Sequence, residues 1–173
     1  MRSLLFPLFL ALALAQPLPP KGGRYIYSDG TLQELLPGEG VYRLRYLKGG
    51  EAFREDRLRL ALEGVHLLGV ELSGRYFPFD PPLFLYPHAP YPGQAYSGSA
   101  RFQGQKVALS GRVEGLEGLR VAAGAYNAWR IRLAYTTEKG GTELKEVYLV
   151  PGLGVVAFRV GRSWVELLRF TPF

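Results

Sequence analysis

The sequence predicts an all-β fold, a single curled antiparallel sheet of about nine or ten short strands with little helix. Polar and apolar residues alternate with a period of two through much of its 173 residues, and 22 glycines and 13 prolines separate the alternating runs. The chain also contains 11 tyrosines and 10 phenylalanines, which favour strands. Such a sheet must curl to cover its apolar face, so we expect a β-sandwich, a half-barrel or a barrel.

The first 15 residues have the pattern of a secretory signal peptide. Arg2 precedes an apolar run over residues 4–12, and the small residues Ala13 and Ala15 come just before Gln16. A basic start, a short apolar core and small residues before the cut are the features of a cleavable export signal. We therefore expect residues 1–15 to be removed and the protein to be exported, to the periplasm, the cell envelope or the outside.

The predicted mature chain is one β domain preceded by a short linker. Residues 16–23 are rich in proline and glycine and predict a linker that does not pack, whereas residues 24–173 suffice for a single domain with its own core. An uncleaved membrane anchor is the alternative for the N-terminus, but a span needs ~20 apolar residues and Pro7 interrupts this run. No later stretch is long and apolar enough, so we expect no transmembrane span after cleavage.

One helical turn and several strands are predicted before residue 75. Thr31 and Glu34 have the spacing of a capping box, which predicts a helical turn that ends at Pro37. After Gly50 a helix is the alternative, but the strict period of two favours a strand. The strands are expected within residues 41–47, 51–62 and 65–72.

Residues 76–92 carry so many prolines that a central strand is excluded, and we expect an ordered aromatic loop or an edge segment. Tyr86, Tyr91 and Tyr96 lie in or beside this stretch, where burial is not forced. Tyrosines among prolines form a rigid amphipathic surface. We therefore predict that these three tyrosines bind a partner, either an envelope protein or a cell-wall component.

The second half of the chain shows the clearest alternation. Gly124 precedes a long alternating run and is expected to take a positive φ before that strand. Pro151, Gly152 and Gly154 predict a tight bend between two further strands. Strands are expected over residues 100–103, 105–114, 125–137, 143–150, 155–160 and 163–170.

Two separated blocks of sequence occur in a distinctive order. Residues 79–83 and 91–96 form the first, and residues 121–129 and 148–156, with their glycine and proline turns, form the second. Together they resemble the DUF3108-like group of bacterial exported proteins and lipoproteins, over residues 75–170. The resemblance implies an exported, curled antiparallel sheet and implies no reaction. This chain departs from the group at Ala123, where proline is usual, and it lacks the cysteine that carries the lipid.

Residues that carry catalysis or bind metals are few. The chain has no cysteine, its two histidines are His66 and His88, and its three aspartates are scattered. Neither histidine belongs to a closely spaced ligand pair, and the sequence has no nucleophile elbow and no phosphate-binding glycine loop before a helix. We therefore assign no catalytic, cofactor-binding or metal-binding residue and expect no cofactor.

The formal net charge is +6, but the basic residues do not form runs. Arginines such as Arg43 and Arg45 alternate with apolar residues, as on the solvated face of a strand. Proteins that bind nucleic acids concentrate their charge in runs or patches, so we expect no nucleic-acid partner.

These observations favour a non-catalytic exported envelope protein that acts as a binding or structural module. A carrier of a lipid or small hydrophobic ligand in a barrel-like cavity is the alternative, and a hydrolase with an unrecognised site is the third hypothesis. The sequence leaves open the oligomeric state and whether the interior of the sheet is filled or hollow.

Overall fold

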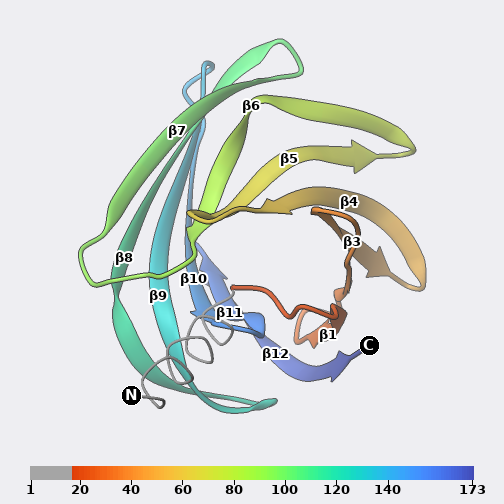
Figure 1. The fold of residues 1–173 in the computed structure, drawn as a ribbon, viewed down its shortest axis with the longest axis vertical. Helices are drawn as coiled ribbons and strands as arrows, with labels where there is room; N and C mark the ends of the chain where they lie inside the picture. The colour runs from red at the N-terminus through yellow and green to blue at the C-terminus, as the bar shows by residue number, and fades with distance from the viewer. Residues whose placement is uncertain (1–16) are drawn as a thin grey trace, which may run out of the picture.

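In the computed structural model, which describes residues 17–173, the chain forms a closed barrel of twelve antiparallel strands (Figure 1). Each strand pairs with its neighbours in sequence, and β12 returns to pair with β1. The prediction of an all-β, curled antiparallel sheet is confirmed, and the barrel replaces the open alternatives with twelve strands instead of nine or ten. The predicted signal peptide lies outside the described residues, and within them no helix could cross a membrane.

The strands follow one another as a meander joined by short turns. They are β1 (Gly23–Tyr27), β2 (Leu32–Leu36), β3 (Val41–Lys48), β4 (Glu51–Leu60), β5 (Gly64–Leu72), β6 (Arg75–Pro87), β7 (Ala95–Phe102), β8 (Gln105–Val121), β9 (Gly124–Thr137), β10 (Thr142–Val150), β11 (Gly154–Val160) and β12 (Ser163–Pro172).

Alternating side chains fill most of the barrel interior. Ile131 of β9 is fully buried, and it is in register with Val113 of β8 and Val147 of β10, which are also fully buried. Arg130 and Arg132 are the residues on either side of Ile131 and lie on the outer face. Full burial of one such apolar side chain stabilises a fold by about 1.5–3 kcal/mol, so this layer holds the central strands together.

The helical turn predicted at Thr31 and Glu34 is wrong, because this segment is strand β2. Its residues pair with β1 on one side and with β3 on the other, and Leu35 is buried in the core. The Asp29 carboxylate instead accepts a hydrogen bond from the Thr31 amide at 2.9 Å, which forms a tight turn before the strand. Tertiary pairing on both edges thus overrides the local capping signal.

The proline-rich segment predicted as a loop is largely strand β6. Its pairing with β7 is registered at one position within the described chain, Asp80 opposite Arg101, and elsewhere the two strands run close together without a regular ladder, so that they are separate in their backbone pairing only. We call this separation the seam. A proline has no amide proton to donate to a neighbouring strand. This loss matters little on the β7 side of β6, where one backbone pair is registered. The seam is therefore the physical reason why so many prolines fit in this strand.

A tyrosine bridges the seam from the inside. The Tyr96 hydroxyl on β7 donates a hydrogen bond to the Leu85 carbonyl on β6 at 2.6 Å. Its ring packs edge-on against Phe84, with centroids 4.9 Å apart, and covers the backbone of Gly111 on β8. A side chain thus supplies the contact that strand pairing does not make here.

The linker predicted for residues 16–23 packs against the barrel from Pro17 onward. Pro17, Leu18 and Pro19 are buried, and Leu18 belongs to the hydrophobic core. Gly22 takes a φ of +72°, and a side chain there would collide with the Leu35 carbonyl. The prediction that this segment cannot pack is wrong because its apolar residues cover one end of the barrel interior.

Candidate functional site

The structure separates the three tyrosines that were predicted to form one exposed loop. Tyr91 is in the turn between β6 and β7 and is 60% exposed. Tyr86 lies on β6 and Tyr96 on β7, and both are partly buried against the core. The loop interpretation of Tyr86 and Tyr96 is therefore corrected, because both flanking strands extend further than the prolines suggested.

The predicted turn residues form backbone features and bring no reactive groups together. Gly124 has a φ of +149°, and Gly152 and Gly154 have φ values of +80° and +105°. Within this bend the Leu153 carbonyl accepts a hydrogen bond of 2.6 Å from the buried Tyr25 hydroxyl. The bend is thereby attached to β1.

Both histidines contact Glu63, and within residues 17–173 no group of three or more histidine, cysteine, aspartate or glutamate side chains could hold a metal ion. The His66 Nε2 atom is 2.7 Å from a Glu63 carboxylate oxygen, and its ring packs on Phe84. His88 lies just beyond β6, where its amide donates to the Glu63 carbonyl.

A groove of about 730 Å³ lies on the outer face of β7 to β11. Its outward residues alternate with inward ones such as Leu133, which is buried in the core. The floor is low because small side chains lie side by side on adjacent strands. We call it the outer groove, and its small residues are Ala95, Ser97, Ser110, Ala134 and Gly161.

Arginines and one leucine form the walls of the outer groove. Arg112 on β8 and Arg159 on β11 are exposed, and neither makes an ion pair with another residue of the described chain. The Arg159 guanidinium lies 5.3 Å from the centre of the Trp164 ring. Leu144 on β10 is 67% exposed. In the sheet register, Arg112, Arg132, Glu146 and Arg159 form one row across β8 to β11, and Ser97, Ser110, Ala134 and Leu144 form the next row. The groove therefore offers two cations without an ion-pair partner, both along the same edge of a floor of small and apolar residues.

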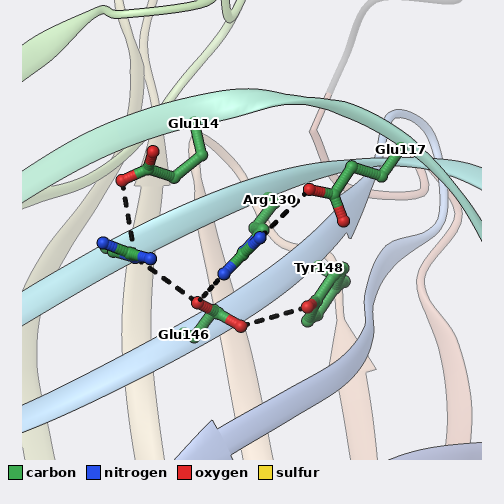
Figure 2. Close-up of polar contacts among 6 residues, drawn as sticks. Glu114, Glu117, Arg130, Glu146 and Tyr148 are labelled. Atoms are coloured by element: carbon green, nitrogen blue, oxygen red, sulfur yellow. Dashed lines mark hydrogen bonds and ion pairs between the residues drawn. The ribbon is translucent and has the colours of Figure 1, made fainter.

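A network of ion pairs surrounds Arg132 on β9 and Glu146 on β10, which both line the outer groove (Figure 2). Glu146 accepts from Arg130 at 2.9 Å and lies 3.5 Å from Arg132. Its other oxygen accepts a hydrogen bond from the Tyr148 hydroxyl at 3.0 Å. The two arginines also reach β8, where Glu114 and Glu117 lie 3.4 and 3.2 Å away. Strands β8, β9 and β10 are thus held in fixed positions beside the groove.

The network keeps Glu146 ionised. Burial alone would raise the pKa of Glu146, but hydrogen bonds from Arg130 and Tyr148 and the charge of Arg130 hold it below its ordinary value. The same carboxylates raise the pKa of the Arg130 guanidinium. A carboxylate with a lowered folded-state pKa adds stability above its unfolded pKa, and this contribution is lost as the pH falls through the folded value.

Replacing Glu146 by glutamine should destabilise the protein by about 1 kcal/mol at neutral pH, because Arg130 loses its closest anion on a partly exposed surface. The difference from the wild type should shrink as the pH is lowered through the lowered pKa of Glu146, because the carboxylate itself then becomes protonated. Urea unfolding at both pH values measures this, with the exposed Glu39→Gln as the control. A pH-independent difference would contradict the electrostatic account.

The comparisons with known proteins show the fold. No family model matches the chain, and no curated protein matches it. One similar solved structure is a lipoprotein candidate from Parabacteroides distasonis, with a TM-score of 0.52, 9% identity, and coverage of 90% of this chain and 98% of that chain. Another is an exported-protein candidate with a YmcC-like fold from Bacteroides fragilis, with a TM-score of 0.50, 12% identity, and coverage of 89% and 98%.

At these identities the two solved structures establish a shared curled β architecture and nothing about chemistry. The DUF3108-like resemblance stays a prediction, since no family model matches. The sequence analysis interpreted the alternating arginines as the solvated face of a sheet and did not predict a groove among them. The sequence did contain a sign of the outer groove. Small residues occupy outward positions next to the arginines, such as Ser110 beside Arg112 and Ala134 beside Arg132.

Proposed function

We propose that the protein is an exported, non-catalytic binding protein whose outer groove takes an extended acidic segment of an envelope partner protein. The observation that carries this proposal is the outer groove itself, with Arg112 and Arg159 exposed along one edge of its floor, on β8 and β11. A guanidinium forms paired hydrogen bonds with a carboxylate, so acidic side chains are the groups that match these walls.

The shape of the groove favours an extended peptide. It crosses five strands, from Ala95 on β7 to Arg159 on β11. Adjacent strands lie about 4.8 Å apart, so the crossing spans roughly 19 Å, the length of about six extended residues. Leu144 would contact an apolar side chain of such a segment, and the volume of about 730 Å³ falls within the range of binding pockets.

Export is supported by the signal-peptide pattern of residues 1–15 and by the two fold neighbours, one described as a lipoprotein candidate and one as an exported-protein candidate. The proposal includes a location of this protein in the cell envelope, outside the cytoplasm. The basic groove also fits a compartment in which acidic segments of other envelope proteins are accessible.

The lipid-carrier alternative has less support from the barrel interior. A partly open cavity within the described barrel has a volume of about 260 Å³. At about 30 Å³ for each water-sized group, a sixteen-carbon acyl chain needs roughly 480 Å³. The interior is therefore too small for an ordinary lipid chain, and the outer groove is the better candidate for the principal binding function.

Binding of a fluorescein-labelled peptide of alternating glutamate and leucine, measured by fluorescence anisotropy, tests the proposal. The double variant Arg112→Glu with Arg159→Glu should weaken binding at least about tenfold, equivalent to about 1.4 kcal/mol, because both walls would repel the peptide. The matched control is Arg75→Glu with Arg169→Glu, which changes the net charge equally at exposed positions outside the groove.

A second readout locates the bound peptide. Because Arg159 stacks on Trp164, binding should change the tryptophan fluorescence in the wild type and leave it unchanged in the Arg112/Arg159 variant. Equal loss of binding in the two double variants would mean that net charge alone attracts the peptide. That result, or the absence of saturable binding to the wild type, would reject the groove as the partner site.

A further inference from the structure

The interior of the barrel contains a second, smaller concavity, which we call the lumen cavity. It has a volume of about 260 Å³ and lies within the circle of strands, on the opposite side of the sheet from the outer groove. Aromatic and aliphatic side chains make most of its wall. They include Tyr27, Tyr86, Leu149 and Phe158, together with Leu18 from the N-terminal segment.

A lysine without an ion-pair partner faces this cavity. Lys145 on β10 is in phase with the buried Val147 and Leu149, so its side chain points inward. Its ammonium nitrogen lies 4.6 Å from the centre of the Phe158 ring. No carboxylate of residues 17–173 lies within ion-pair distance of it. Burial lowers the pKa of this ammonium and the charge of Arg54 lowers it further, against the opposing charges of Glu143 and Asp56.

The acidic residues of the lumen cavity have other partners. Asp56 is almost fully buried and receives two hydrogen bonds from Arg54, at 2.6 and 2.9 Å, and a third from the Tyr46 hydroxyl at 3.1 Å. Asp29, at the exposed edge, accepts from the Thr31 amide. The Arg54 and Asp56 charges compensate each other, so Lys145 is the remaining cation of the interior.

We propose that the lumen cavity binds a small organic carboxylate with an apolar or aromatic body, its carboxylate paired with Lys145. At about 30 Å³ for each water-sized group, the cavity has room for roughly nine non-hydrogen atoms, the size of a benzoate. The ring of such a ligand would lie among Tyr27, Tyr86 and Phe158, which provide flat apolar surfaces. Its carboxylate would supply the counter-charge that Lys145 lacks, because a partly desolvated cation gains most from a paired anion.

This inference is independent of the outer groove, because the two concavities have different ligands and different determining residues. Sodium benzoate is the probe, and benzamide, which has nearly the same shape and no charge, is the matched ligand control. Saturation-transfer NMR and ligand-dependent shifts of the thermal midpoint measure binding. We expect saturable binding of benzoate, with benzamide at least about tenfold weaker.

Two lysine variants separate the lumen cavity from general charge effects. Lys145→Met should remove benzoate binding while raising the midpoint of the free protein, because it replaces a poorly compensated cation with an apolar side chain of similar length. Lys106→Met, which removes an exposed lysine of β8, should leave benzoate binding unchanged. Should Lys145→Met fail to fold, Lys145→Gln takes its place.

Intermolecular NOEs in the wild-type protein provide a readout that needs no variant. Contacts between the benzoate ring and the rings of Tyr27 and Phe158 are expected. Contacts to groove residues such as Leu144 instead, equal affinity for benzamide, retained binding in the Lys145 variants, or no binding of benzoate at millimolar concentration would each overturn the proposal.

Discussion

Replacing Gly111 by alanine should destabilise the barrel by about 2–4 kcal/mol, although the change adds only one methyl group. The new methyl would overlap the Tyr96 ring, which lies directly on the Gly111 backbone. Tyr96 would have to move, and its hydrogen bond to the Leu85 carbonyl across the seam would break. The loss combines overpacking with an unpaired carbonyl, and urea unfolding measures it.

Gly115, on the same strand, provides the matched control for this substitution. No atom lies within 4 Å of the position that its added methyl would occupy, and its φ is not positive. Gly115→Ala should therefore stay within about 0.5 kcal/mol of the wild type. Tyr96→Phe keeps the ring and removes the hydroxyl, and should lose about 1 kcal/mol. Equal stabilities of the Gly111 and Gly115 variants would show that Tyr96 does not bridge the seam.

Replacing Asp56 by asparagine should destabilise the protein by about 2–3 kcal/mol, because within residues 17–173 Asp56 is the carboxylate that forms an ion pair with Arg54. Asp56 is 4% exposed and holds three charge-assisted hydrogen bonds from Arg54 and Tyr46. Arg54 is partly exposed and keeps some access to water, which limits the loss below that of a fully buried pair.

The control for the Asp56 variant is Asp80→Asn, which removes the same charge from an exposed side chain. Its free energy of unfolding should lie within about 0.5 kcal/mol of the wild type. Chemical denaturation of the two variants, read by circular dichroism, compares them directly. If both variants lost the same stability, the interior charge cluster would have no special role in holding β3 and β4 together.

Much of the barrel could be predicted because strand periodicity is local information. The alternation around Trp129 and Ile131 predicted β9 over almost its full length. The helical turn predicted at Thr31 is wrong because the segment pairs on both edges with β1 and β3, the strands that flank it in sequence. The spacing of Thr31 and Glu34 reports only a local capping preference, which two-sided strand pairing overrides.

The prolines of β6 show a different limit. Their density is consistent with interrupted pairing, but the sequence could not show where the interruptions lie: β6 has one registered pair with β7, and its ladder with β5 skips residues 79–82. Pro78 still lies opposite Gly69 of β5. Tyr86 and Tyr96 were consequently expected in a loop, whereas both lie on strands and pack against the core.

The candidate sites were harder to predict than the fold, because each depends on residues from several strands. Lys145 and Asp56 nonetheless carried a local signal, since each occupies a polar position in the apolar phase of its strand, beside Val147 and Leu58 respectively. Such an exception to the pattern marks an inward charge. The residues that pair with this charge, and the space around it, can be identified only in the closed barrel.

The pairing of β1 with β12 has a consequence for how the chain folds. Every other pair joins neighbouring strands and can form as a local hairpin, whereas Tyr25 lies opposite Phe170 at the other end of the domain. During synthesis β1 emerges early, and the backbone groups on its free edge stay unpaired until β12, the last strand, has been made. In that interval the exposed edge can pair with another chain, so the yield of correctly folded barrel depends on how fast the C-terminal strand arrives.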